Sequence, residues 1–377
     1  MPIHQLRMIQ FRNHLQSHFQ FIPQMNILYG PNGSGKTSVL EAIHCLTVAK
    51  SFKTPYDKRL VQHDSDFYQL EGQFKFGDES DTVQLNYVPN QGKKLFINSG
   101  EQDKLSAVVG RYPVVTLTPE DSKITFGPPS IRRKYVNKVM SQTSPEHMER
   151  LIEFQNIIKQ RNALLQEFAD NDSGKIDETL ISVYDEKLIQ ISERIEIARL
   201  QFFERFKDYF QKVYNNLNKD SHSVKIRYSP SVSFENSEQF ESDFREALVR
   251  RRNQELAFRR TMVGPQSDII DIYFDGKNLR DYGSQGEHKL VLVALKIAEG
   301  EYITRERDQS PIYLFDDLFA ELDIERSKKI LDAIDARGQI LITSTDLSDI
   351  RHHGIDLEGQ DIKVFDMSEI NANGVAA

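Results

Sequence analysis

The sequence predicts an α/β fold built from both ends of the chain, with a helical domain inserted between them. Strand patterns alternate with helix patterns in residues 1–112 and again in residues 262–377, whereas residues 113–261 have mainly helical patterns. A chain of 377 residues is also long enough for two domains. We therefore expect the two ends to form one α/β domain with mixed sheets, and residues 113–261 to form a separate arm.

The N-terminal part contains short runs with the alternation of strands. These runs cover residues 4–11, 17–21, 25–30, 67–74 and 82–88, and a turn is expected at 76–80. A helix is predicted from Lys36 to about Ala49. Its cysteine, Cys45, is the only one in the chain, so no internal disulfide is possible, and we expect it to pack as a small apolar residue.

The arm begins with helical patterns from about residue 128. Ser144, Pro145 and Glu146 suit the N-cap and first turn of a helix, and the polar stretch 171–174 is expected to end it. The apolar residues of the next helix alternate spacings of three and four, as in a coiled-coil seam; they are Ile181, Tyr184, Leu188, Ile191, Ile195, Ala198 and Phe202. Two such helices joined by a short turn predict an antiparallel arm.

The C-terminal part returns to alternating strands and helices. Strands are predicted at 268–274, 312–315 and 339–344, and helices from Ser284 and over 324–336. The longest apolar run, residues 290–295, is far below the ~20 residues of a membrane span. With no secretory signal pattern and a single cysteine, the chain is expected in the cytoplasm.

The net charge of −8 is weak evidence against a nucleic-acid partner, because phosphate binding depends on local potential. Basic residues cluster at 131–138 and 249–260. Each cluster is either a solvated helix face or a phosphate-binding patch, and the pattern alone leaves both readings open.

The stretch YGPNGSGKTS, residues 29–38, has the spacing of a phosphate-binding P-loop between a strand and a helix. Glycines let backbone N–H groups turn toward phosphate oxygens, while Lys36 neutralises phosphate charge from an exposed loop and Thr37 is a Mg²⁺ ligand. The predicted nucleotide-binding residues of this stretch are Gly30, Pro31, Asn32, Gly33, Ser34, Gly35, Lys36, Thr37 and Ser38.

A P-loop requires a carboxylate at the end of a neighbouring strand to hold the metal. The strand IYLF ends in Asp316 and Asp317. We expect Asp316 to bind Mg²⁺ through water and Asp317 to orient the attacking water. Some 280 residues separate the two motifs, unlike in small GTPases and nucleotide kinases, and this layout resembles ABC-type ATPases of the chromosome-maintenance kind.

Those ATPases have a signature sequence at the start of a helix, and YGSQGEHKL resembles it through Ser284, Gly286 and Glu287. These three residues and Gln285 between them are added to the predicted nucleotide-binding residues. A simpler reading is a capping box formed by Ser284 and Glu287, and the two readings are compatible. Residues 319–323, FAELD, resemble a dimer-contact loop. Residues 342–346 resemble a switch segment, which adds Thr345 to the nucleotide-binding prediction.

The resemblance extends over nearly the whole chain to the RecF family of DNA repair and replication proteins. It is carried by IQFRNH, GPNGSGKTSVLEAIHCLTVAKSFKT, LTPEDSKITFGPPSIRRKYVNKVM, IIKQRNALL, SQGEHKLVLVALKIAE and FDDLFAELD, in that order. It implies a weak ATPase that uses ATP and Mg²⁺ and forms a homodimer on ATP. Catalytic roles fall to Lys36, Asp317 and Ser284, the last acting on nucleotide held by the other subunit.

The resemblance further implies a clamp on duplex DNA near single-stranded gaps that helps to load recombinase with RecR- and RecO-like partners. It also gives Arg132, Arg133 and Lys134 a role near DNA or the nucleotide, against the alternative of a structural ion pair. Asn137, Gln266, Ser267, His288 and Lys289 depart from the family pattern. The main alternative is an SMC-like ATPase that organises DNA without loading recombinase. A transport ATPase fits the long helical arm less well. A small-molecule kinase would need no signature helix. An ATPase–nuclease fusion fits less well because only about thirty residues follow the switch segment.

Overall fold

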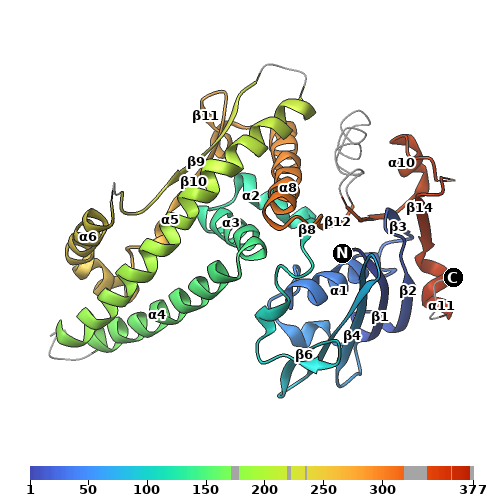
Figure 1. Ribbon diagram of the computed structural model, residues 1–377, viewed down its shortest axis with the longest axis horizontal. Helices are drawn as coiled ribbons and strands as arrows, with labels where there is room; N and C mark the ends of the chain where they lie inside the picture. The colour runs from blue at the N-terminus through green and yellow to red at the C-terminus, as the bar shows by residue number, and fades with distance from the viewer. Residues whose placement is uncertain (171–177, 219–221, 234–235, 318–337, 358, 374–377) are drawn as a thin grey trace. The chain divides into compact units, whose positions relative to one another are not determined.

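The computed structural model describes residues 1–170, 178–218, 222–233, 236–317, 338–357 and 359–373, which form two compact units (Figure 1). The first unit comprises residues 1–122, 212–219 and 285–377, and the second comprises 123–211 and 220–284. These units differ from the predicted domain ranges at both boundaries. The strand Val114–Leu117 (β8) joins a sheet of the first unit, and Ile269–Phe274 (β10) joins a sheet of the second.

The first unit contains a parallel sheet in which strands from both ends of the chain interleave. Its order is β14-β3-β13-β12-β8. Besides β8, its strands are β3 (Met25–Tyr29), β12 (Ile312–Phe315), β13 (Ile340–Ser344) and β14 (Ile362–Asp366). β3 lies between β14 and β13, and every pair is parallel. The carboxyl ends of β3, β12 and β13 therefore lie at one edge, which is where α/β sheets bind ligands.

An antiparallel sheet forms the other layer of this unit. Its order is β2-β1-β4-β5-β6-β7, with bounds β1 (Ile3–Phe11), β2 (His14–Gln20), β4 (Tyr68–Phe76), β5 (Glu79–Val88), β6 (Gly92–Ile97) and β7 (Gly100–Glu101). Helix α1 (Lys36–Val48) contacts β1, β4 and β5 of this sheet and β13 of the parallel sheet. The predicted N-terminal strands and the helix are confirmed.

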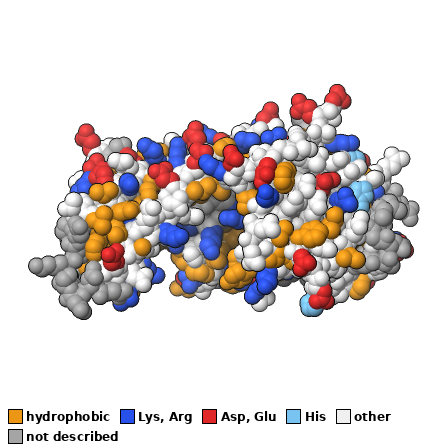
Figure 2. Space-filling view, turned by 90° about the horizontal axis from the view of Figure 1, so that it is seen from below, with side chains coloured by type: hydrophobic (Ala, Val, Ile, Leu, Met, Phe, Trp, Pro, Cys, Tyr) orange, Lys and Arg blue, Asp and Glu red, His pale blue; other side chains and the backbone are white. Residues whose placement is uncertain are grey.

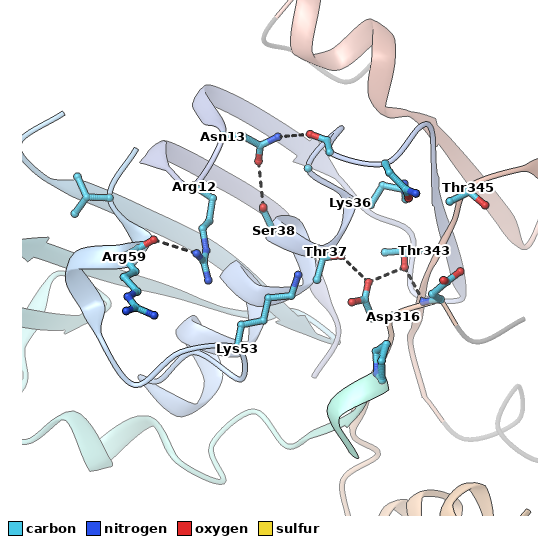
Figure 3. A pocket seen from close by; sticks show the side chains of 16 residues that line it. Arg12, Asn13, Lys36, Thr37, Ser38, Lys53, Arg59, Asp316, Thr343 and Thr345 are labelled. Atoms are coloured by element: carbon cyan, nitrogen blue, oxygen red, sulfur yellow. Dashed lines mark hydrogen bonds between the residues drawn. The ribbon is translucent and has the colours of Figure 1, made fainter. Parts of the chain in front are cut away.

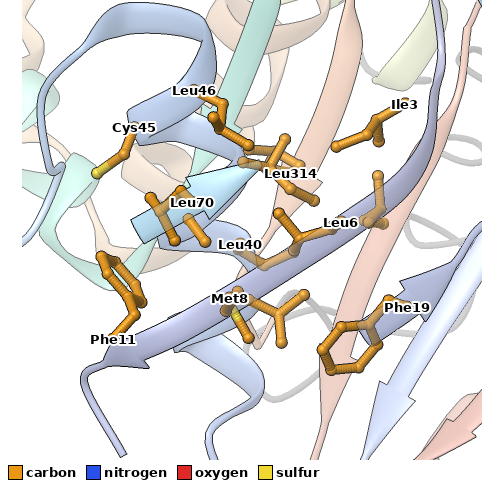
Figure 4. Packing of buried hydrophobic residues seen from close by; sticks show 14 of the residues in the cluster. Ile3, Leu6, Met8, Phe11, Phe19, Leu40, Cys45, Leu46, Leu70 and Leu314 are labelled. Atoms are coloured by element: carbon orange, nitrogen blue, oxygen red, sulfur yellow. The ribbon is translucent and has the colours of Figure 1, made fainter. Parts of the chain in front are cut away.

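The core of the first unit joins these layers. Leu6 and Met8 of β1, Leu40 of α1, Leu70 of β4 and Leu314 of β12 are buried in one cluster (Figure 4). Cys45 is 1% exposed in the same cluster, as predicted. Since complete burial of a leucine-sized side chain is worth roughly 1.5–3 kcal/mol, this cluster stabilises the packing of α1 between the two sheets.

Other described elements lie within this unit, and among them only the helix from Ser284 was predicted. They are α8 (Gln285–Arg307), α10 (Leu347–His352), α11 (Met367–Asn373) and the short 3-10 turns η1 (Asp57–Leu60), η2 (Leu105–Val108) and η3 (Pro119–Ser122). The predicted loop 319–323, the helix 324–336 and the turn 171–174 lie outside the described residues. Within the described residues, no helix has the length and apolarity needed to cross a membrane.

The second unit is mainly helical. Its helices are α2 (Lys123–Phe126), α3 (Pro129–Thr143), α4 (Pro145–Asp170), α5 (Glu178–Leu217), α6 (Ser237–Phe258) and α7 (Leu279–Tyr282); the last residues of α5, 212–217, belong to the first unit. Seam residues of α5 such as Leu188 and Ile195 are buried against Phe154 of α4, but Phe240 and Phe244 of α6 share that core. The structure is therefore a three-helix core, where the sequence predicted a two-helix arm.

A small sheet completes the second unit. β10 pairs with β9 (Val224–Ser229) and with β11 (Lys277–Asn278), both antiparallel; the 3-10 turn η4 (Pro265–Ser267) precedes β10. β9 was absent from the sequence prediction. On the face of the molecule in Figure 2, Lys and Arg side chains are interspersed with Asp and Glu, so the negative net charge leaves room for local positive areas.

The predicted N-cap of α4 is confirmed and gives a stability prediction. Ser144 Oγ accepts a hydrogen bond of 3.1 Å from the backbone N–H of His147 in the first turn. We expect Ser144→Ala to lower the free energy of unfolding by about 1 kcal/mol, because one first-turn N–H loses its acceptor. Denaturant unfolding measures this loss. Ser144→Asp keeps an acceptor and should stay near wild type; an equal loss in both variants would show that the cap contributes nothing.

Candidate nucleotide-binding site

The P-loop connects the carboxyl end of β3 to the start of α1. Gly33 and Gly35 have φ values of 83° and 92°, in the left-handed region where a side chain is strained. A Cβ on Gly35 would also lie 2.4 Å from Nε2 of His14. Glycine at this position is therefore required by both backbone conformation and space, and the loop takes the path that turns N–H groups toward an anion.

Hydrogen bonds to the P-loop backbone hold the side chain of Lys36 in place. Its Nζ donates to the carbonyl oxygens of Gly30 at 2.6 Å and Pro31 at 3.0 Å, and the residue is only 8% exposed. The loop predicted to be exposed is exposed at Pro31, Asn32 and Gly33, whereas Lys36 itself is buried. Burial lowers the pKa of Lys36, while the negative charges of Asp317 and Asp316 oppose this shift. The ammonium group is oriented before any phosphate arrives.

The structure brings the two predicted metal ligands together across 279 residues of sequence. Thr37 Oγ1 donates to Asp316 Oδ1 at 2.8 Å, and Thr343 Oγ1 donates to the same oxygen at 2.9 Å. These groups are hard oxygen donors of the kind that Mg²⁺ prefers, with positions left for water and phosphate. The residues present therefore fit a magnesium ion. Among the described residues, no group of three or more His, Cys, Asp or Glu side chains offers another metal site.

Asp317 follows Asp316 but has a different environment. Its backbone is left-handed, with φ 58°, and its N–H donates to Thr343 Oγ1 at 2.9 Å. A non-glycine residue in this region is uncommon and is often found at functional sites. The side chain is exposed, whereas Asp316 is half-buried. The two carboxylates therefore differ in exposure and in backbone conformation.

These residues line a pocket of about 560 Å³ (Figure 3). The predicted site residues in its wall are Asn32, Gly33, Gly35, Lys36, Thr37, Ser38, Asp316, Asp317 and Thr345. Ser284, Gln285, Gly286 and Glu287 are not in that wall. At the start of α8, the first three are exposed. Gly30, Pro31 and Ser34 belong to the loop but do not line the pocket.

Sequence reasoning missed several pocket residues. Arg12, Lys53 and Arg59 add three cations to Lys36. Arg12 is fixed by Glu41, to which its Nε and Nη2 both donate at 2.7 Å. Such a cationic wall is suited to a polyphosphate. Arg12 and Lys53 lie in stretches that carry the family resemblance and Arg59 lies outside them, and no local spacing marks any of the three as a ligand.

Asn13 was also missed. Its Nδ2 donates to the carbonyl oxygen of Gly33 at 3.0 Å, and Ser38 Oγ donates to its Oδ1 at 3.1 Å (Figure 3). The side chain thus links the end of β1 to both sides of the P-loop. It holds the loop in shape from the neighbouring sheet.

The residues that depart from the family pattern fall into two groups. Asn137, Gln266 and Ser267 belong to the helical unit, where Gln266 Nε2 donates to Val263 O at 2.9 Å and Ser267 Oγ to Met262 O at 2.8 Å. His288 and Lys289 are half-buried in the first turns of α8. None of the five lines the nucleotide pocket of the same chain.

The basic stretch 131–138 divides by exposure. Arg132 is 2% exposed and donates to Gly127 O at 2.9 Å and Asp271 Oδ1 at 3.3 Å. Arg133 Nη1 donates to Asp268 O at 2.7 Å. Lys134 is exposed. Of the two alternatives for this stretch, the structural ion pair therefore applies to Arg132, whose hydrogen bonds are made within the helical unit.

The parallel sheet, the P-loop and the paired carboxylates define a P-loop ATPase of the ABC class. The chain belongs to the RecF family, as a sequence model described as RecF/RecN/SMC N terminal domain matches residues 2–353. A protein of Salinibacter ruber named DNA replication and repair protein RecF is 38% identical over 351 residues, which are 92% of this chain and 85% of that protein.

Solved structures agree with this family. A structure of the recombination mediator protein RecF with ATP, from the RecFOR pathway, is 26% identical, with a TM-score of 0.85 over 91% of this chain and 92% of that one. The corresponding structure with an ATP analogue has a TM-score of 0.87 at 24% identity and covers 100% and 97% of the two chains, which supports the shared fold.

Proposed function

We propose that this protein is an ATP-dependent DNA-binding protein of recombinational repair and replication restart. It forms a homodimer on ATP, clamps duplex DNA near single-stranded gaps and helps to load recombinase there together with RecR- and RecO-like partners. Slow ATP hydrolysis releases the clamp. The family supports the DNA-repair role, since its relatives carry the name DNA replication and repair protein RecF.

One observation carries the dimerisation step. The start of α8 has the signature residues Ser284, Gln285 and Gly286, which are exposed and do not line the pocket of their own chain. A helix N-terminus attracts anions because its first N–H groups are unpaired. The proposal is that this helix end completes the nucleotide site of a second copy.

The site residues have separate tasks in this proposal. Gly33, Gly35 and Lys36 bind the phosphates, while Thr37 and Asp316 hold Mg²⁺. When bound, the metal supplies positive charge beside the phosphate oxygens. Asp317 accepts a hydrogen bond from the attacking water and orients it.

Size-exclusion chromatography tests the proposal, with ATP, ADP or no nucleotide, each without DNA, with gapped DNA and with intact duplex. We expect a dimer only with ATP, and more of it with gapped DNA. A monomer under all conditions would contradict the clamp. Equal binding to gapped and intact duplex would instead favour an SMC-like organiser of DNA.

Asp317→Asn is expected to bind ATP normally and to hydrolyse it at least about 100-fold more slowly, since it removes the carboxylate that orients water but leaves Asp316 in place. Single-turnover ATP hydrolysis measures the rate, and the lifetime of the dimer should increase in parallel. Asp308→Asn, at an exposed position outside the pocket, is the matched control. Turnover equal to wild type would assign this task to another residue.

A further inference from the structure

The helical unit has a cavity of its own, of about 630 Å³. Its walls come from α3, α4, α5 and the segment 259–266. All of its charged lining residues are cations: Arg133, Lys134, Lys159, Arg199 and Arg259. The whole chain has a net charge of −8, but the wall of this cavity contains five cations and no carboxylate. The local charge of the cavity is therefore opposite in sign to that of the chain.

Arg199 forms the buried end of the cavity. It is 2% exposed, and its guanidinium is oriented by Asp268, by Pro265 O at 2.8 Å and by Asn137 Oδ1 at 3.1 Å. Its Nε–H is buried without a hydrogen-bond partner in the described part of the chain. A buried donor left without an acceptor costs about 1–3 kcal/mol. A bound anion would supply the missing acceptor.

The other cations are available to a ligand to different degrees. Lys134 and Lys159 are exposed, and neither forms an ion pair or hydrogen bond with the described residues. Arg133 is less available, because its Nη1 donates a hydrogen bond to the carbonyl oxygen of Asp268. Burial and then the charge of Arg199 lower the pKa of Arg133, while the charge of Asp268 opposes this shift.

The uncharged lining helps to define the ligand. Amide side chains, including Gln155 and Asn162, and the apolar residues Phe154 and Ile158 face the same space. Planar guanidinium groups match the several oxygen acceptors of a phosphate, and a cavity of this volume is within the usual range for small organic ligands.

We propose that this cavity binds a phosphate group attached to a nucleotide-sized organic moiety. The phosphate lies between Arg133, Arg199 and the two lysines, and the amide and apolar side chains contact the rest of the ligand. The phosphate belongs either to a free nucleotide or to a nucleic-acid strand. No residue of this cavity lines the P-loop pocket, so the cavity is a separate site from the proposed nucleotide site.

The test uses the full chain carrying Lys36→Ala, so that the P-loop does not compete, with wild type in parallel. Fluorescence anisotropy measures binding of a labelled short oligothymidylate with or without a 5′-phosphate, and dCMP and inorganic pyrophosphate serve as competitors. Lys134→Glu with Lys159→Glu should raise the Kd about tenfold or more, because two charge-assisted contacts become repulsive.

Lys225→Glu with Arg227→Glu is the matched control. It makes the same change of charge at two exposed residues of β9 outside the cavity, and its Kd should stay within about twofold of wild type. Thermal unfolding verifies that each variant is folded, and the pair Lys134→Gln with Lys159→Gln repeats the test with less repulsion.

The competitors identify the source of the phosphate. Displacement by dCMP or pyrophosphate indicates a free phosphate ligand, and tighter binding of the 5′-phosphorylated strand indicates a nucleic-acid end. Both outcomes support the site if the cavity variants weaken them. If no phosphate probe binds more weakly to the cavity variants than to the control pair, the proposal is overturned.

Discussion

Lys36→Ala is expected to weaken ATP binding by at least about 100-fold. The ammonium group is oriented by two hydrogen bonds to the P-loop, and each charge-assisted hydrogen bond that it makes to phosphate is worth about 1.5–3 kcal/mol. Because Lys36 also bonds to the carbonyl oxygens of Gly30 and Pro31, the variant further loses two contacts that shape the P-loop. Titration with a fluorescent ATP analogue measures the affinity.

Lys58→Ala is the matched control for this variant. Lys58 is an exposed lysine of η1 that does not line the pocket, so its removal should change the affinity by less than about twofold. The two lost hydrogen bonds of Lys36 predict a small decrease in thermal stability as well. Unchanged ATP affinity in a folded Lys36→Ala protein would show that the phosphate lies elsewhere.

The sequence predicted that the P-loop would connect a strand to a helix and that Asp316 would follow a strand, because these features depend on motifs whose spacing is local. Residues 29–38 form the loop between β3 and α1, and Asp316 follows the next strand but one in the sheet. The contact between Thr37 and Asp316 could be expected once β3 and β12 were assumed to be parallel strands of one sheet, since their carboxyl ends then lie at the same edge.

The cationic wall of the pocket could not be predicted in this way. Lys53 reaches it from the segment between α1 and η1, Arg59 from η1 itself, and Arg12 from the end of β1. Isolated basic residues on connecting segments have no period or spacing that marks them. Their function depends on tertiary position.

The domain boundaries were missed for a related reason. β8 and β10 are short apolar strands, and their patterns do not say which sheet they join. Val115 pairs with Tyr313, and Ile270 pairs with Tyr228, so both assignments depend on long-range partners. The shared core of α4, α5 and α6 was likewise invisible, because the seam of α5 is equally suited to one partner helix or two.

Ser284→Arg is expected to abolish ATP-driven dimerisation without weakening ATP binding by the monomer. Ser284 is exposed immediately before α8 and does not line the pocket formed by Lys36 and Thr37 in the same chain. In the proposed dimer, its hydroxyl and the positive end of α8 face the nucleotide of the other subunit. A bulky arginine fills that space, and a clash of this size raises the dimer Kd at least about tenfold.

Light scattering with ATP measures the dimer fraction, and a fluorescent ATP analogue measures the monomer affinity. The capping-box reading predicts another result, a loss of about 1 kcal/mol in stability with normal association. Ser284→Ala separates the two, because it removes the cap but adds no bulk, and it should dimerise far better than the arginine variant.

DNA affinity should fall together with dimerisation, with a weaker dependence on salt, since a clamp with one half missing contacts fewer phosphates. Normal dimerisation of Ser284→Arg would mean that the nucleotide site is complete in a single chain, and α8 would then be a purely structural helix of the first unit.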